Sequence, residues 1–168
     1  MSLKPLIIYY SKTGTTAKIA ETVQHMIKAE SRRLGEPKGW RSRLKLSYLR
    51  KNFDLIEPAT VIDKFDPIIL MTPVWKGKPT LAMIEFLEKV DLKGKRVVLG
   101  LVGANETNPN ALEKLRRKAI ERGCTFVETI YLRGVLPGHD WTDLKEEDYL
   151  REATRLAEKV SAVSEFTR

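Results

Sequence analysis

A short run of hydroxyl-bearing residues near the amino terminus has the chemistry of a phosphate-binding turn. The run consists of Ser11, Lys12, Thr13, Gly14, Thr15 and Thr16. Its hydroxyl groups can donate hydrogen bonds to an anion, and Gly14 lets the backbone turn tightly against a ligand. Amide groups at the start of a following helix would add donors and a favourable dipole. The run therefore predicts a site for a terminal phosphate monoester, where Lys12 either adds charge or points into water.

The sequence also bears on two alternatives to this interpretation. The P-loop pattern of glycine, four residues and Gly-Lys-Ser/Thr is absent from the sequence, and so is Gly-x-Gly-x-x-Gly after a strand. A turn of serine, threonine and glycine before a helix can also serve only as a helix cap. Spacing alone leaves this second alternative open.

The other reactive side chains do not form a second site in the sequence. Cys124 is the one cysteine of the chain, which excludes an internal disulfide and any cysteine-based metal motif. His25 lies on an expected helix, and His139 follows a Pro-Gly pair in an expected loop. Because nothing in the spacing brings these residues together, we predict no metal site and assign no catalytic residue.

The positive charge of the chain is concentrated in one segment. The net charge is +8, and residues 28–51 contain nine basic and two acidic side chains, whereas the rest is nearly balanced. The aromatic residues Trp40, Tyr48 and Phe53 lie in or beside this segment, which raises the hypothesis of a nucleic-acid-binding module. No recognised nucleic-acid motif accompanies the charge, so a solvated helix face or docking on an acidic protein is the favoured interpretation.

Apolar runs alternate with stretches of helical spacing, and these elements would position the turn. Strands are expected at residues 5–10, 67–72, 95–102 and 125–132, with a weak second strand within 29–37. Helices are expected to begin at Thr15, at Pro79, at Asn108–Pro109 and after a capping pair of Asp143 and Glu146. Their expected apolar stripes include Ala20, Val23, Leu81, Ile84, Leu87, Leu115, Ala119, Leu150 and Leu156.

This order of elements predicts one α/β domain over residues 1–168. A doubly wound, parallel, five-stranded sheet would lie between two helical layers. Residues at about 38–53 are expected to form an inserted basic amphipathic helix, with Trp40, Leu44 and Tyr48 facing inward.

No part of the sequence is suited to crossing a membrane. No apolar run approaches the roughly 20 residues that a bilayer requires, and the run before Ser11 is too short for a secretory core. We therefore expect a cytoplasmic location without membrane contact, which suits a chain with a single cysteine.

In its longer context, the first motif resembles the phosphate loop of the flavodoxin-like family. The match runs from Ile7, Ile8, Tyr9 and Tyr10 into the turn at residues 11–16 and includes Ala20 and Val23. A second segment is similar to a flavin loop of a flavodoxin-like subfamily: Thr72, Pro73, Val74, Trp75, Lys76 and Gly77. Weaker similarity extends to residues 93–97 and 132–134. The resemblance implies strand order 2-1-3-4-5, with FMN (flavin mononucleotide) bound at the carboxyl ends of the strands.

The resemblance also implies roles for individual residues. The turn at residues 11–16 would hold the phosphate, and residues 72–77 would pass the isoalloxazine ring, with Trp75 covering one face. Gly77 would allow a peptide flip that answers the protonation state of flavin N5. The third loop departs from the family pattern because it has no aromatic residue, so the second ring face is expected to be open or covered by the insertion. This loop contains Gly103, Ala104 and Asn105.

The activity that the resemblance implies is electron transfer by a small FMN protein. The alternative is an NAD(P)H-dependent, FMN-containing quinone or flavin reductase, which ranks second because the sequence shows no obvious nicotinamide site. Lys76 and Lys78 flank the expected ring, and we hypothesise that their charge makes two-electron reduction of the flavin easier. The expected partner is an acidic redox protein or a small-molecule electron acceptor, and nucleic acid is the least favoured.

Overall fold

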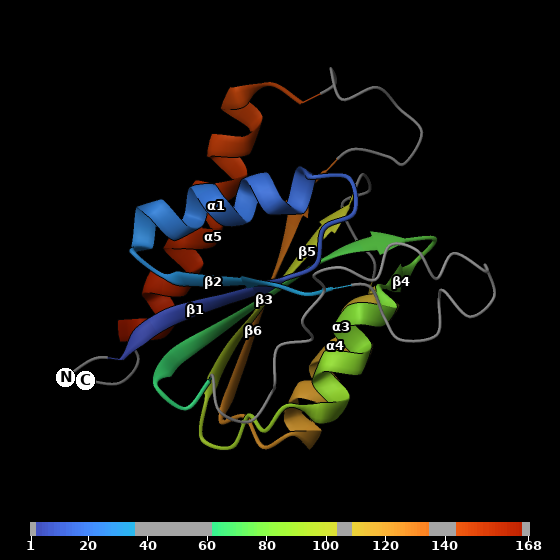
Figure 1. Ribbon diagram of the computed structural model, residues 1–168, viewed down its shortest axis with the longest axis vertical. Coiled ribbons are helices and arrows are strands. Elements are labelled where there is room, and N and C mark those ends of the chain that lie inside the picture. Colours follow the sequence, from blue (N-terminus) through green and yellow to red (C-terminus); the bar gives the residue numbers. More distant parts are fainter. Residues whose placement is uncertain (1–2, 36–61, 104–108, 135–143, 166–168) are drawn as a thin grey trace, which may run out of the picture.

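Apolar runs of the sequence form the strands of one sheet, and amphipathic segments form helices on both of its faces (Figure 1). The structure, a computed structural model, describes residues 3–35, 62–103, 109–134 and 144–165. In chain order the elements are β1 (Lys4–Tyr9), α1 (Thr15–Ile27), β2 (Glu30–Arg33), β3 (Phe65–Trp75), β4 (Lys78–Pro79), α3 (Leu81–Lys89), β5 (Arg96–Gly103), α4 (Pro109–Glu121), β6 (Phe126–Arg133) and α5 (Glu146–Glu165). The predicted insertion at about 38–53, and Phe53, Asn108, His139 and Asp143, lie outside the described residues.

Five strands pair in the order β2-β1-β3-β5-β6, and each pair is parallel. Ile7 of β1 lies opposite Ser31 on one side and Ile69 on the other. This confirms the predicted order 2-1-3-4-5, because β5 and β6 are the fourth and fifth parallel strands. The prediction of five strands was incomplete, since the short strand β4 pairs antiparallel with the end of β3 and makes the sheet six-stranded. We call the edge at which the parallel strands end the carboxyl edge.

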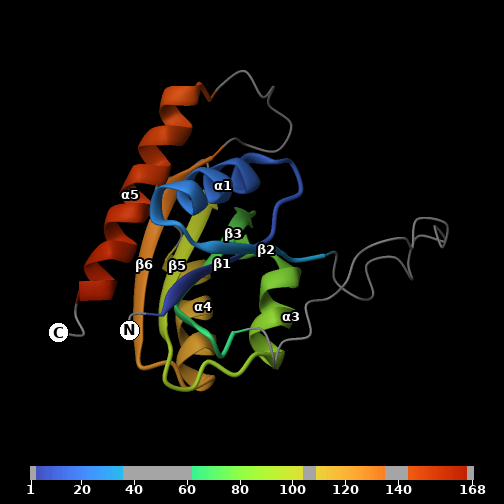
Figure 2. The ribbon, with the colours of Figure 1, turned by 60° about the vertical axis from the view of Figure 1, so that its left-hand side comes forward.

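Alternate side chains of the strands enter two separate cores, which gives the predicted three layers. Ile7 and Ile69 pack in one core with residues of α1 and α5. Ile8 and Leu70 pack in the other with residues of α3 and α4. Figure 2 shows α1 and α5 on one side of the sheet and α3 on the other. Each such side chain contributes roughly 1.5–3 kcal/mol when fully buried, so the sheet is a rigid support for its carboxyl edge.

The helix α3 begins two residues later than predicted, and this changes which side chains it buries. Pro79 belongs to β4, and Thr80 is the residue that precedes the helix. The hydroxyl groups of Thr80 and Thr72 are 2.8 Å apart in the core. Leu87 is buried as expected, but Leu81 is 53% exposed. The strand β4 therefore contains Pro79, which was predicted to begin the helix.

The last helix, α5, also begins differently from the prediction. Glu146 is the first residue of α5, and the carboxylate of Asp148 accepts the backbone N–H of Lys145 at 3.0 Å. This bond, followed by a bond from Arg151, lowers the pKa of Asp148. Leu150 was expected in the apolar stripe but is 55% exposed. Among the described residues, neither α5 nor any other helix is long and apolar enough to cross a membrane.

Candidate functional site

The turn between β1 and α1 is closed by its own side chains. Ser11 is 3% exposed, and its hydroxyl oxygen accepts the N–H of Gly14 at 3.1 Å. Gly14 has a φ of 100°, a left-handed conformation that residues with a Cβ rarely adopt. The carbonyl of Gly14 accepts the N–H of Lys18 at 2.8 Å, where α1 begins. The turn therefore has a defined shape that only glycine fits well at position 14.

Thr15 places a buried hydroxyl at the N-terminus of α1 without a hydrogen-bond partner. The residue is 5% exposed, and its Oγ1 makes no hydrogen bond to any residue that the structure describes. Thr16 is also buried, whereas Lys12 and Thr13 are exposed. Burying an unpartnered hydroxyl costs about 1–3 kcal/mol, so such atoms in native proteins need an explanation. A bound anion with acceptor oxygens would satisfy this hydroxyl, as well as amides of the first helical turn.

The strand β2 brings to the turn a cation that the sequence analysis missed. Arg33 lies opposite Tyr9 in the parallel register, and its Nη2 donates to the carbonyl oxygen of Ser11 at 2.6 Å. The backbone N–H of Leu34 donates to the Tyr9 carbonyl at 2.7 Å, which holds this end of β2 against β1. In the sequence, Arg33 is only one of several charged residues in a short, weakly predicted strand. The register in which β2 pairs with β1 is what places Arg33, rather than a neighbour, at the turn.

The second predicted flavin segment is a hairpin rather than a loop that follows a strand. The predicted third strand ended at Thr72, but β3 continues to Trp75 and pairs with β4 through Trp75 and Lys78. Lys76 and Gly77 form the tip, with φ values of 48° and 75°. Positive φ at both central residues is the pattern of a type I′ turn. The hydroxyl of Thr72 is fully buried and bonded to that of Thr80, so it joins the base of the hairpin to the start of α3.

The structure brings the turn and the hairpin into contact through Trp75. The ring of Tyr10 meets the ring of Trp75 edge-on, with centroids 6.0 Å apart and an interplanar angle of 76°. The Nζ of Lys12 lies over the Trp75 ring, 5.8 Å from its centroid. The exposed side chain of Lys12 therefore lies close to the second segment. Two segments that are about 60 residues apart in the sequence are therefore in contact at the carboxyl edge.

The third predicted loop begins where β5 and β6 pack closely. Gly103 ends β5, and its carbonyl accepts the N–H of Gly134 at 2.9 Å, whereas Ala104 and Asn105 lie outside the described residues. A Cβ at Gly134 would be 2.7 Å from Cγ1 of Val102 and 3.7 Å from Cγ2 of Thr15. This contact requires glycine, and it places the ends of β5 and β6 beside the turn.

The described part of the chain contains no group of three or more His, Cys, Asp or Glu side chains that could hold a metal ion. Cys124 is half-buried, and burial raises the pKa of its thiol, which disfavours the reactive thiolate. His25 is exposed on α1. The described chemistry of the site is therefore that of hydroxyl groups, backbone amides, two aromatic rings and cations.

Solved flavodoxin-like structures resemble the chain over most of its length. A flavoprotein from Lactobacillus acidophilus NCFM in complex with FMN is 22% identical, with a TM-score of 0.55 over 79% of this chain and 93% of that one. Flavodoxin 2 from Bacillus cereus is 24% identical, with a TM-score of 0.53 over 93% and 99% of the two chains. An NADH:FMN oxidoreductase in its apo form is 19% identical, with a TM-score of 0.58 over 96% and 88%.

These similarities establish the fold of the chain, which is flavodoxin-like. No protein-family model and no curated protein matches the sequence. The fold therefore rests on the parallel strand order, the two helical layers and the structural matches together.

Proposed function

We propose that the chain binds FMN at the carboxyl edge and acts in electron transfer. The observation that carries the proposal is the Thr15 hydroxyl, which is buried and unpartnered at the N-terminus of α1. A phosphate monoester would offer acceptor oxygens to this hydroxyl and to amides of the turn. The FMN complex of the Lactobacillus acidophilus flavoprotein, which has the same fold, supports the choice of ligand.

Two groups of residues would divide the ligand between them. The phosphate would be held by Ser11, Lys12, Thr13, Gly14, Thr15 and Thr16. The ring would lie along Thr72, Pro73, Val74, Trp75, Lys76 and Gly77, with Gly103, Ala104 and Asn105 at the third loop. When bound, the flavin supplies one- and two-electron chemistry, and the chain supplies position and electrostatics. Lys12 would join the two groups, because it belongs to the turn and lies over Trp75.

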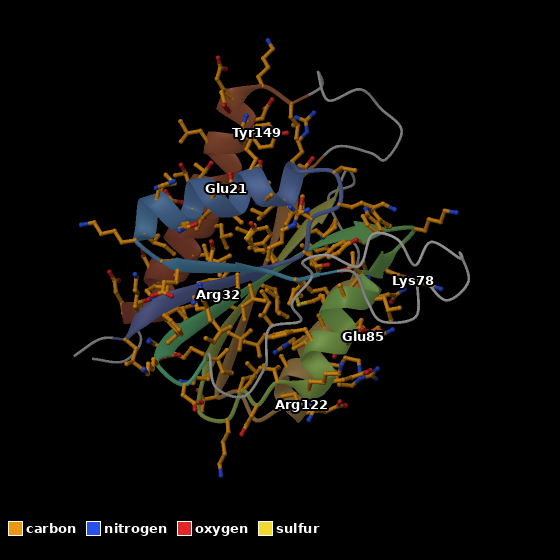
Figure 3. All side chains as sticks on the ribbon, in the orientation of Figure 1. Glu21, Arg32, Lys78, Glu85, Arg122 and Tyr149 are labelled. Atoms are coloured by element: carbon orange, nitrogen blue, oxygen red, sulfur yellow. The ribbon has the colours of Figure 1, made fainter. Side chains whose placement is uncertain are left out.

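The exposed lysines of the hairpin support a carrier that docks on an acidic redox protein. Lys76 follows Trp75 in the chain, Lys78 pairs with Trp75 across the hairpin, and both lysines are exposed. Figure 3 labels Lys78. Their charges would attract an acidic surface and favour electron uptake by a nearby flavin. We place the protein in the cytoplasm, where the single thiol of Cys124 would stay reduced. A small-molecule electron acceptor is the other partner class that this exposed edge admits.

The second candidate function is an NAD(P)H-dependent FMN reductase of quinones or flavins. The similarity to an NADH:FMN oxidoreductase over 96% of the chain favours keeping it. A steady-state assay with FMN-loaded protein, NADPH or NADH, and a quinone separates the two functions. Turnover without an added reductase would favour the enzyme over the carrier.

Titration of the purified apoprotein with FMN tests the proposal itself. We expect stoichiometric quenching of flavin fluorescence and a higher melting temperature. At a free FMN concentration of 100 times Kd, the stabilisation would be about 2.7 kcal/mol. Unchanged fluorescence and melting at saturating FMN would contradict the proposal.

The substitution Thr15→Val separates ligand binding from folding. We expect the apoprotein to keep or gain stability, by up to roughly 1 kcal/mol, because an unpartnered hydroxyl is no longer buried. FMN should bind about tenfold more weakly, because one hydrogen bond to a charged phosphate is lost. In the control Thr22→Val, the lost hydroxyl donates to the Lys18 carbonyl at 2.8 Å on the exposed side of α1, so FMN affinity should not change. A less stable Thr15→Val apoprotein with wild-type FMN affinity would show that the hydroxyl has a structural role only.

A further inference from the structure

Two consecutive arginines of β2 make different contacts. Arg32, labelled in Figure 3, donates to Glu30 of the same strand at 3.2 Å. Arg33 instead donates to the carbonyl oxygen of Ser11, 22 residues away in the chain, at 2.6 Å. Both side chains are exposed. Only one of the pair therefore reaches the phosphate turn.

The contact from Arg33 fixes a peptide plane of the turn. Ser11 is held twice, since its carbonyl oxygen accepts from Arg33 and its hydroxyl oxygen accepts from Gly14. In a trans peptide the C=O and the next N–H point in opposite directions. Holding the Ser11 carbonyl toward β2 therefore directs the N–H of Lys12 away from β2. Arg33 thus orients a backbone donor of the turn from outside the turn.

The charge of Arg33 is not neutralised by a carboxylate within the described residues. None of the ion pairs there includes Arg33, whereas Arg32 is paired with Glu30. A guanidinium has five N–H donors, and the bond to Ser11 occupies one of them. The field of Arg33 also reaches β1. Burial of Tyr9 raises the pKa of its phenol, the carboxylate of Glu21 raises it further, and Arg33 opposes them.

We infer that Arg33 is a positioning residue of the anion site, which shapes the turn and gives it a preference for a doubly charged phosphate. This inference rests on the proposed function, because it assigns the phosphate of the ligand to the Ser11–Thr16 turn. Arg33 adds to Lys12 a positive charge that is held in place by its hydrogen bond to the Ser11 carbonyl. Since the charge acts on the phosphate alone, it discriminates between FMN and riboflavin, which has the same ring without the phosphate.

Binding of FMN and of riboflavin to matched variants tests the inference. We expect Arg33→Gln to weaken FMN binding about tenfold, because a charge-assisted contribution is lost, and to leave riboflavin affinity within about twofold. Arg33→Lys keeps the positive charge but loses the planar set of N–H donors of the guanidinium. Its FMN affinity should therefore lie between those of Arg33→Gln and the wild-type chain. Arg32→Gln is the control and should bind both ligands like the wild-type chain. The loss in Arg33→Gln should shrink at high salt, because screening weakens the wild-type interaction.

Several results would overturn the inference. These are equal weakening of FMN and riboflavin in Arg33→Gln, equal effects of Arg33→Gln and Arg32→Gln, or a wild-type FMN affinity in Arg33→Gln. The last result would leave the proposed function standing, since the wild-type chain would still bind FMN.

A second experiment, with inorganic phosphate in place of FMN, tests the role of Arg33 independently of flavin binding. We expect phosphate to raise the melting temperature of the wild-type apoprotein and of Arg32→Gln more than that of Arg33→Gln. If the wild-type chain binds no FMN but shows this pattern, the proposed function fails and the role of Arg33 stands. If neither FMN nor phosphate has any effect on the wild-type chain, both are overturned.

Discussion

The β1–α1 turn and the β3–β4 hairpin lie side by side at the carboxyl edge, but they are built in opposite ways. The turn is closed, with Ser11 and Thr15 buried and the Ser11 carbonyl held by Arg33. The hairpin tip is open, with Lys76 and Lys78 exposed and no side-chain bond among the described residues that fixes them. Among the described residues, Trp75 links the two segments, because Tyr10 and Lys12 contact its ring from the β1 side.

From this contrast we infer which property of the site each segment controls. A closed turn with preformed donors recognises one chemical group, because its geometry does not adapt. An exposed, charged hairpin has no such restriction and acts through its field and its aromatic surface. We therefore expect changes in the turn to alter phosphate recognition, and changes in the hairpin to alter the ring environment and partner docking.

The largest expected effect is that of Gly14→Val in the turn. A β-branched residue is strongly disfavoured at a φ of 100°, so the turn would change shape, and we expect FMN affinity to fall roughly a hundredfold. The apoprotein should lose about 1–2 kcal/mol of stability. Fluorescence titration and thermal melting measure the two quantities.

The matched control for this prediction is Gly94→Val, at a glycine with a φ of 75° and no atom within 4 Å of an added Cβ. It carries similar backbone strain in the connection before β5, away from the carboxyl edge. Its stability should fall by a similar amount, while its FMN affinity should stay at the wild-type value. If both variants lost FMN affinity equally, general destabilisation would explain the result and the turn would have no special role.

The contrast between the segments also separates what the sequence could predict from what it could not. The turn was predictable because its residues are contiguous and follow directly from a buried strand into a helix. The parallel order was predictable because strands such as β3 and β5 are long apolar runs, which is typical of strands buried on both faces. Both signals are local in the sequence.

The hairpin was missed because the predicted strand ended at Thr72, directly before Pro73, and residues 72–77 were assigned to a loop. The backbone carbonyl of Met71 accepts the N–H of Tyr10, so the backbone polar groups of Met71 point toward β1. Those of Pro73, two residues further along the strand, point to the same side. The strand β1 ends at Tyr9, so no ladder bond is needed from Pro73, and β3 continues to Trp75. Arg33 was missed for a similar reason, since only the register that places it opposite Tyr9 brings it to Ser11.

An intermediate effect is expected for Trp75→Leu in the hairpin. The substitution removes an aromatic surface beside the expected ring, so FMN and riboflavin should both lose about three- to tenfold in affinity. This equal loss contrasts with the turn variants, which should affect FMN alone. The control Tyr131→Leu removes a half-buried aromatic from β6, packed against the core that α3 and α4 share, and should leave both affinities unchanged. A selective loss of FMN binding in Trp75→Leu would show that Trp75 acts on the phosphate through Lys12.

The smallest effect is expected for charge reversal at the hairpin, in the double variant Lys76→Glu/Lys78→Glu. Exposed charges act weakly through water, so the flavin midpoint potential should fall by roughly 10–30 mV, with FMN affinity nearly unchanged. Electron transfer to an acidic ferredoxin should slow and lose its dependence on ionic strength, whereas transfer to a basic cytochrome should not slow. Lys89→Glu, at the end of α3, is the control for added negative charge. The double variant could instead match the control in both its midpoint potential and its rate of electron transfer to the ferredoxin. The hairpin lysines would then be only solvated surface charges, and the hairpin would have no role in docking that distinguishes it from the turn.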